Sequence, residues 1–310
     1  MATLKELRDR IEGVQNIQQI TRAMKMVAAA RLQRAEKAIV SLRPYASRLD
    51  SFCARFISEA VGLEHPFFEQ REVENHLVLG IASDRGLCGS YNNKVTDETR
   101  RVIEKEEADS HHLEVIGTRG ALGMRHEGYE PDRVHEDVFN PVEFEFSEEL
   151  STCMQEMFLH HEVDRVSVVY SKFYSPVRQE VLCRTLMPCD PGQSWNRMKE
   201  EAAGAEDLEG VEKEPDELGT PEDDVYIYEP SYGEVCRDLV HRNITVQLHR
   251  CLLEAQASEQ GARMIAMDNA TDNAEEMVED LTRKMNRQRQ ESITRELLDI
   301  AAGAEQMRKG

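Results

Sequence analysis

The stretch Ile20-Thr21-Arg22-Ala23-Met24-Lys25-Met26-Val27-Ala28-Ala29-Ala30 lies within an N-terminal segment that contains no proline before Pro44. Apolar residues recur three or four positions apart along this segment, over about ten helical turns. Such a stripe is typical of one long amphipathic helix that packs against a second helix. Its members are Leu4, Leu7, Ile11, Val14, Ile17, Ile20, Met24, Val27, Leu32, Ala35, Ile39 and Leu42.

The predicted N-terminal helix covers residues 1–60. Thr3 and Glu6 have the spacing of a capping box at its start. Pro44 is expected to kink or interrupt the helix, because proline removes a backbone donor and clashes with the preceding turn. The apolar spacing resumes at Leu49.

The C-terminal segment, residues 231–310, is also free of proline and is predicted to be a second helix. Its spacing alternates between three and four through Met264, Met267, Thr271, Ala274, Val278, Leu281 and Met285. At ~1.5 Å per residue such a helix is on the order of 110 Å long, too long for the rest of the chain to cover. The two terminal segments therefore predict a long antiparallel two-helix coiled coil.

The middle of the chain predicts a small α/β domain over residues 74–190. Short apolar runs rich in β-branched residues begin at His76, His112, Val163 and Gln179, and helical patterns separate the first three. This alternation favours a mostly parallel, Rossmann-like sheet. The next stretch, residues 191–225, is so acidic and poor in apolar residues that we expect a disordered insertion.

Charge and composition exclude several classes of protein. The chain has 310 residues and a formal net charge of −21, which argues against nucleic acid as the main partner. We expect neither a signal peptide nor a transmembrane helix. The seven widely spaced cysteines favour a reducing compartment. Residues 1–60 are net basic, whereas the acidity is concentrated in residues 61–230.

The motifs predict no catalytic, cofactor or metal site. No glycine precedes a lysine and Gly-x-Gly is absent, so neither the P-loop nor the dinucleotide fingerprint is present and nucleotide binding is not expected. Cys88, in the turn Ser83–Gly89, has two interpretations. It is a nucleophile of an α/β hydrolase whose helices form an oligomerisation stalk, or part of a tight strand-to-helix turn, which the residues favour.

The remaining cysteines and histidines do not form a convincing site. Cys183 and Cys189 are interpreted as unconnected thiols rather than a redox switch. The spacing of Cys236, His241, His249 and Cys251 does not converge on one metal ion. A long coiled-coil scaffold remains as a further alternative function.

Four stretches together closely resemble the gamma subunit of F-type ATP synthase. They are residues 20–30, Ser83–Gly89, Arg263–Ala274, and Ile293–Leu297 with Gly303-Ala304. The resemblance covers nearly the whole chain and implies a non-catalytic central-stalk rotor that turns inside the alpha–beta hexamer. It couples proton flow through the c-subunit membrane ring to conformational cycling of the catalytic beta subunits. It also implies contact with the epsilon subunit, no cofactor, and a peripheral position on the cytoplasmic face of the bacterial inner membrane.

The resemblance also implies residues that contact other subunits. Met24 and Lys25 correspond to positions that face an acidic loop of beta. Arg263, Gln290 and Thr294 correspond to positions that bond the catch loops of alpha and beta. A final group, Tyr226, Tyr228 and Glu229, matches the region that meets the membrane ring and epsilon. The acidic stretch resembles an insertion, and because Cys183 and Cys189 precede it, thiol regulation is not expected.

Overall fold

The computed structural model describes residues 3–59, 66–106, 108–139, 141–189, 229 and 231–309. The chain divides into two compact units. The first unit comprises Met1–Ala29 and Arg263–Gly310, and the second comprises Ala30–Ala262. The acidic stretch 191–225, together with Tyr226 and Tyr228, lies outside the described residues.

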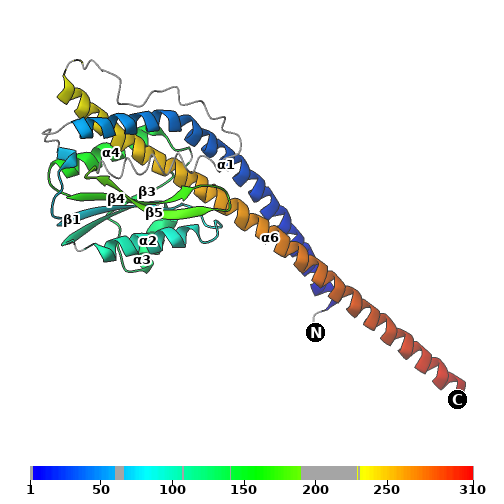
Figure 1. Ribbon diagram of the computed structural model, residues 1–310. Coiled ribbons are helices and arrows are strands. Elements are labelled where there is room, and N and C mark those ends of the chain that lie inside the picture. Colours follow the sequence, from blue (N-terminus) through cyan, green and yellow to red (C-terminus); the bar gives the residue numbers. More distant parts are fainter. Residues whose placement is uncertain are drawn as a thin grey trace. The chain divides into compact units, whose positions relative to one another are not determined.

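Two long helices and a central mixed sheet confirm the coarse prediction of the fold (Figure 1). Helix α1 spans Leu4–Glu59 and helix α6 spans Tyr232–Lys309, so each contributes to both units. At the start of α1, the Thr3 hydroxyl accepts a hydrogen bond from the Glu6 backbone, and the Glu6 carboxylate accepts one from the Thr3 backbone. The predicted capping box is therefore formed.

Helix α1 continues through Pro44, so the expected interruption is not found. A proline inside a helix costs ~3 kcal/mol, which packing on the following turns offsets here. Ala46 and Leu49 are buried and pack with Val246 of α6. Burial of apolar side chains contributes ~1.5–3 kcal/mol for each large residue, enough to keep the helix intact across the proline.

The sheet has five strands in the order β3-β2-β1-β4-β5. Their bounds are β1 Asn75–Ile81, β2 Ser110–Ile116, β3 Arg133–His135, β4 Arg165–Phe173 and β5 Gln179–Met187. Strands β1 to β4 pair in parallel, and β5 pairs antiparallel with β4. The four longer strands were predicted, whereas the three-residue β3 was not.

Helices cover both faces of the sheet (Figure 1). Helices α2 (Tyr91–Lys105) and α3 (Thr118–His126) pack on one face. Helix α4 (Phe144–Leu159) and residues 236–255 of α6 pack on the other, and a short 3-10 turn, Pro66–Phe68, joins this core. The central strand β1 is buried from both sides, as a parallel strand between helical layers must be. None of the described helices has the apolar length that a membrane span requires.

Candidate functional site

In the first unit, the side of α1 that faces α6 carries buried residues seven positions apart. These residues, Leu7, Val14, Thr21 and Ala28, form the seam of α1. Residues that keep the same face of a helix toward a partner recur with this spacing. The seam therefore includes a threonine and an alanine where the apolar stripe of the sequence suggested larger residues.

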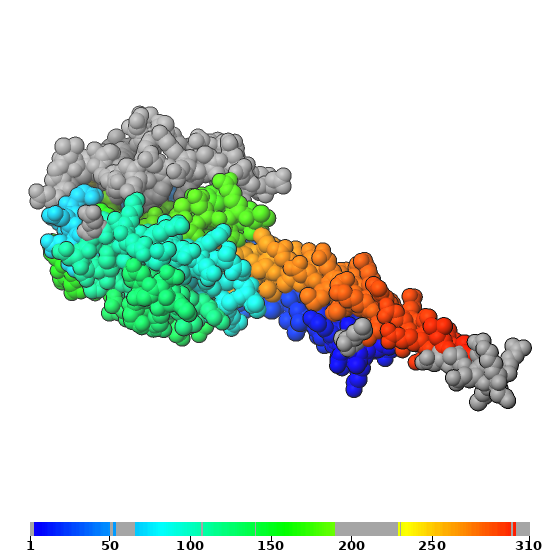
Figure 2. All heavy atoms as spheres, turned by 90° about the horizontal axis from the view of Figure 1, so that it is seen from below, coloured from blue at the N-terminus to red at the C-terminus, as the bar shows by residue number. Residues whose placement is uncertain are grey.

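Helix α6 supplies the matching seam in the reverse direction. Leu281 and Ala274 form one apolar cluster with Leu7 and Val14. Three polar contacts continue the pairing along both helices, as the residue numbers rise on α1 and fall on α6. They are Gln18 with Glu275 at 3.4 Å, Thr21 with Thr271 at 2.8 Å, and Lys25 with Asp268. The helices are thus antiparallel in this unit, and Figure 2 shows them side by side.

Three residues expected in the seam lie outside it. Ile17, Ile20 and Val27 are each more than half exposed in the chain. Ile20 and Val27 each precede a buried seam residue by one position, which places them ~100° around the helix from the seam. This part of the prediction is wrong, because the spacing of apolar residues alone does not say which side of a broad stripe faces the partner. An apolar surface on α1 is left open.

A second open apolar surface lies near the C-terminal end of α6. Ile293, Leu297, Leu298 and Ile300 are 48–68% exposed. Leu7, near the start of α1, packs in the same cluster as Leu281, so α1 begins opposite that part of α6. Helix α6 then extends beyond the start of α1, and the exposed apolar residues lie in this extension (Figure 2). Exposed apolar residues that gather on one element mark an interaction site rather than ordinary surface.

The predicted contact residues fall into separate groups. Lys25 pairs with Asp268 of its own chain, and both side chains are about half exposed. Met24 is half-buried, and Arg263 is only 8% exposed. Gln290 and Thr294 are exposed, and the Thr294 hydroxyl donates to the Gln290 carbonyl at 2.9 Å. Glu229 is exposed just before α6.

The turn at Cys88 is built as a structural corner. Cys88 is 1% exposed, and its Sγ accepts a hydrogen bond from Asn92 Nδ2 at 3.3 Å. The Asn92 side-chain oxygen accepts from both the backbone and the hydroxyl of Ser83. A sulfur enclosed in this way is poorly placed to attack a substrate. The geometry fits a strand-to-helix turn.

The carboxyl ends of β1 and β4 are where this sheet would bind a ligand, because the strand order reverses between them. Helix α6 lies there instead. The Tyr91 hydroxyl approaches the carbonyl oxygens of Ile81 and Ala255, at 3.3 and 3.2 Å, and the Ser258 hydroxyl donates to the Ser171 carbonyl at 2.8 Å. The α/β domain therefore holds a helix of its own chain at the position that related folds use for ligands.

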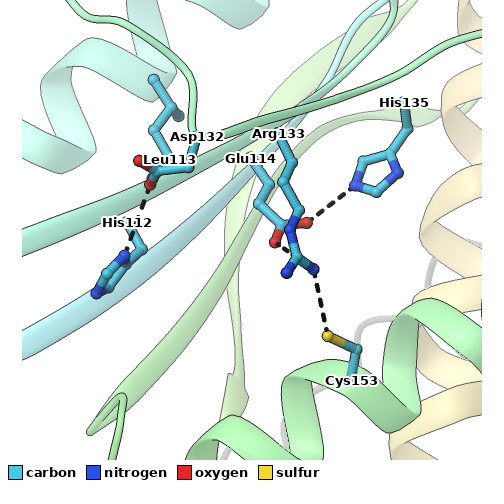
Figure 3. A network of polar contacts seen from close by, with 7 residues as sticks. All are labelled: His112, Leu113, Glu114, Asp132, Arg133, His135 and Cys153. Atoms are coloured by element: carbon cyan, nitrogen blue, oxygen red, sulfur yellow. Dashed lines mark hydrogen bonds and ion pairs between the residues drawn. The ribbon is translucent and has the colours of Figure 1, made fainter.

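A polar network at the sheet edge was not predicted (Figure 3). Glu114 is buried in β2, and its carboxylate pairs with His135 at 2.9 Å and with Arg133 at 3.8 Å, both on β3. Arg133 also donates to Cys153 Sγ on α4 at 3.5 Å. The network ties the short strand β3 to its neighbours. The sequence feature that could have indicated this network is Glu114, a glutamate within an apolar strand run.

The other cysteines and histidines form no metal site in the described part of the chain. All seven cysteines are free. His241 and His249 of α6 bond Gln155 and Ser147 of α4 rather than converging on each other. Burial lowers the pKa of His249, which favours the neutral form of the imidazole.

Comparisons with known proteins place these features in one family. A family model described as ATP synthase matches residues 3–307. The chain is 36% identical over 315 residues to the ATP synthase gamma chain of Chlorobaculum parvum, with 100% of both chains covered. It is 37% identical over 314 residues to the ATP synthase gamma chain of Salinibacter ruber, with 98% of both covered. The acidic stretch thus lies inside alignments that span the relatives almost end to end.

Solved structures share the fold at lower identity. A chain of the Euglena gracilis mitochondrial ATP synthase, in an assembly of OSCP, F1 and c-ring, matches with a TM-score of 0.65 and 19% identity. That match covers 98% of this chain and 94% of the other. A chain of the Tetrahymena thermophila mitochondrial ATP synthase central stalk and c-ring matches with a TM-score of 0.56 and 20% identity, over 81% and 99% of the two chains.

Proposed function

This chain belongs to the ATP synthase gamma chain family, and from that premise we propose that it is the central-stalk rotor of an F-type ATP synthase. The observation that carries the proposal is the pair of open apolar surfaces in the first unit. One consists of Ile17, Ile20 and Val27 on α1, and the other of Ile293, Leu297, Leu298 and Ile300 on α6. Such surfaces are costly in water, and a surrounding sleeve of alpha and beta subunits would cover them.

The mechanism of the rotor is differential binding. The helix pair presents different side chains on different sides, with apolar residues at Ile20 and Val27 and the half-exposed Lys25–Asp268 pair elsewhere. Each orientation therefore interacts unequally with the three catalytic beta subunits. An orientation that binds one conformation of beta more tightly shifts the population toward that conformation. Catalysis belongs to the beta subunits, and this chain supplies the coupling.

The exposure of Lys25, Gln290 and Thr294 supports the subunit contacts that the resemblance implies. Met24 and Lys25 would face the acidic loop of beta, and Lys25 is accessible enough to exchange Asp268 for a partner carboxylate. Gln290 and Thr294 are exposed and would bond the catch loops. Arg263 would join them after a change of side-chain conformation, since it is largely buried in the chain alone. Tyr226, Tyr228 and Glu229 would meet the c-ring and epsilon.

The first unit would work as an antiparallel coiled coil. The seven-residue spacing of its seam and the three cross-helix polar contacts support this arrangement. The complex would place the chain as a peripheral component on the cytoplasmic face of the bacterial inner membrane. The buried thiol of Cys88 and the family of the chain both oppose a hydrolase function.

Reconstitution tests the proposed function. The full chain is mixed with the alpha and beta subunits, and assembly and ATP hydrolysis are measured. We expect a complex that contains one copy of this chain and hydrolyses ATP. Failure of the wild-type chain to assemble would refute the rotor and favour an unrelated coiled-coil scaffold.

A variant makes the test specific to the apolar surface on α1. Ile20→Ser together with Val27→Ser is expected to weaken assembly or ATP-driven proton pumping, because these side chains would face the sleeve. Arg8→Ser is a matched control at another exposed position of the same helix. Equal behaviour of the double variant and the control would count against the assigned surface.

A further inference from the structure

Helices α4 and α6 of the second unit are joined by three polar pairs that repeat every four residues. The first joins Ser147 Oγ to His249 Nδ1 at 2.8 Å, the second joins Ser151 Oγ to Thr245 Oγ1 at 3.0 Å, and the third joins Gln155 Oε1 to His241 Nδ1. Because the numbers rise on α4 as they fall on α6, the helices are antiparallel here. We call these six residues the polar zipper.

The zipper is largely removed from water. Ser147, Ser151, Gln155, Thr245 and His249 are all buried, and His241 marks the exposed end. The pairs are also linked to one another, since Gln155 Nε2 donates to Ser151 Oγ at 2.7 Å. Buried polar groups are costly unless each finds its partner, so this network tolerates little displacement.

The order of the pairs selects one axial register. If α6 slid by one helical turn in one direction, Ser147 would meet Leu253 and Gln155 would meet Thr245. A slide in the other direction would bring Arg237 opposite Gln155. The first shift places the buried Ser147 hydroxyl opposite an apolar side chain, and the second brings the charged Arg237 into the interface. Polar residues inside helix interfaces are known to set register in this way.

The sheet holds the same part of α6 from other sides. Arg184 of β5 donates to Gln247 Oε1 at 2.8 Å, and Ser258 donates to the Ser171 carbonyl of β4 at 2.8 Å. Tyr91 at the start of α2 approaches the Ala255 carbonyl. Contacts from α2, α4 and the sheet oppose both sliding and rotation of α6 within this unit.

We propose that the polar zipper is the positioning device that transmits torque between the α/β domain and α6. This inference rests on the proposed rotor function and assigns torque transmission to residues that are mostly buried within the second unit. A rotor transmits work only if the helix does not turn or slide inside the domain that grips it. Helix α6 then continues without a break into the first unit.

The experiment replaces both members of the Ser151–Thr245 pair together with Gln155, whose partner His241 lies at the exposed end. Ser151→Ala with Thr245→Val and Gln155→Leu preserves burial but removes two of the three polar pairs of the zipper. Thr152→Val, on the next position of α4, is the matched control. The complete ATP synthase is assembled in vesicles with each chain, and ATP-driven proton pumping and ATP hydrolysis are measured together.

We expect the ratio of pumping to hydrolysis to fall at least two-fold in the triple variant and to stay unchanged in the control. A ratio equal to that of the wild type, in an assembled triple variant, would overturn the torque role. If the wild-type chain itself fails to assemble, the rotor function is refuted, and the torque role that rests on it is refuted too.

A second variant keeps the inference testable if the triple variant does not assemble. Ser151→Cys with Thr245→Cys places two thiols where the hydroxyl oxygens lie 3.0 Å apart. The same complex is measured after oxidation and after reduction, with the wild type treated alike. We expect a higher pumping-to-hydrolysis ratio in the oxidised state. Equal ratios in the two states, with the cross-link verified by mass, would also overturn the proposal.

Discussion

The hydroxyl groups of Thr21 and Thr271 lie 2.8 Å apart and join α1 to α6 across 250 positions of sequence. Both side chains are buried. Each hydroxyl also lies close to a carbonyl of its own helix, Gln18 at 3.0 Å and Met267 at 2.7 Å. The pair therefore places polar groups in the seam without leaving either of them unsatisfied.

Thr21→Val should lower the free energy of unfolding of the full chain by about 1 kcal/mol, the net value of one hydrogen bond. Urea unfolding measures this change. Thr282→Val is the matched control, since the Thr282 hydroxyl donates to Val278 of its own helix. We expect the control to lose clearly less, and an equal loss would show that the cross-helix bond adds nothing.

The Lys25–Asp268 ion pair should matter less than the threonine pair, despite its charge. Both side chains are about half exposed, so water and salt screen the attraction. Asp268→Asn is expected to change the free energy of unfolding by less than about 0.5 kcal/mol, measured by urea unfolding at low salt. A loss above about 1 kcal/mol would mean that the pair stabilises the helices directly.

Glu114 should be the most sensitive residue of the network in Figure 3. Glu114→Ala removes the partner of both His135 and Arg133 from a buried position and is expected to cost about 1–3 kcal/mol of unfolding free energy. Glu114→Gln keeps an acceptor for His135 and should lose less. If both substitutions cost the same, the charge rather than the hydrogen bond would hold β3 in place.

Stability should fall in mild acid because of His76. Burial, with His111 and Arg165 nearby, lowers the pKa of His76 to about 4. The unfolded chain binds this proton near pH 6.5, so stability is complete above that value and is lost as the pH falls toward 4. We expect His76 to account for about 2 kcal/mol of lost unfolding free energy between pH 7 and pH 5.

Urea unfolding of the wild type and of His76→Gln at the two pH values tests this prediction. The variant should be less stable at pH 7, since it loses a buried residue that packs against its neighbours, but its stability should depend less on pH. A pH dependence as steep as that of the wild type would assign the acid sensitivity to other groups.

Cys88→Ala should leave ATP hydrolysis by the assembled complex intact. The thiol is buried and bonded to Asn92, so its loss affects only local packing. Hydrolysis by the reconstituted complex with alpha and beta subunits is the measurement. A complete loss of hydrolysis in a normally assembled complex would revive a catalytic role for this cysteine.

Much of the second unit could be predicted from local sequence patterns. The strands at His76, His112, Val163 and Gln179 were placed within a few residues of β1, β2, β4 and β5. Strand β3 could not be predicted, because three residues are too few for any periodicity, and its pairing depends on Glu114 of β2. The polar zipper could not be predicted either, since its paired residues lie 86–102 positions apart and each half looks like an ordinary helix face.

The sequence by itself determined that both ends of the chain are long helices and that the middle is an α/β domain, because helical and strand periodicities are local properties. Only the tertiary structure decided which side of α1 faces α6. Thr21 and Ala28 are buried there, whereas Ile20 and Val27 remain exposed. Which side of α1 is buried depends on the α6 residue that lies opposite each position, and the Thr271 hydroxyl is the hydrogen-bond partner of Thr21. That single rotation of the helix leaves the apolar surface on which the proposed rotor function rests.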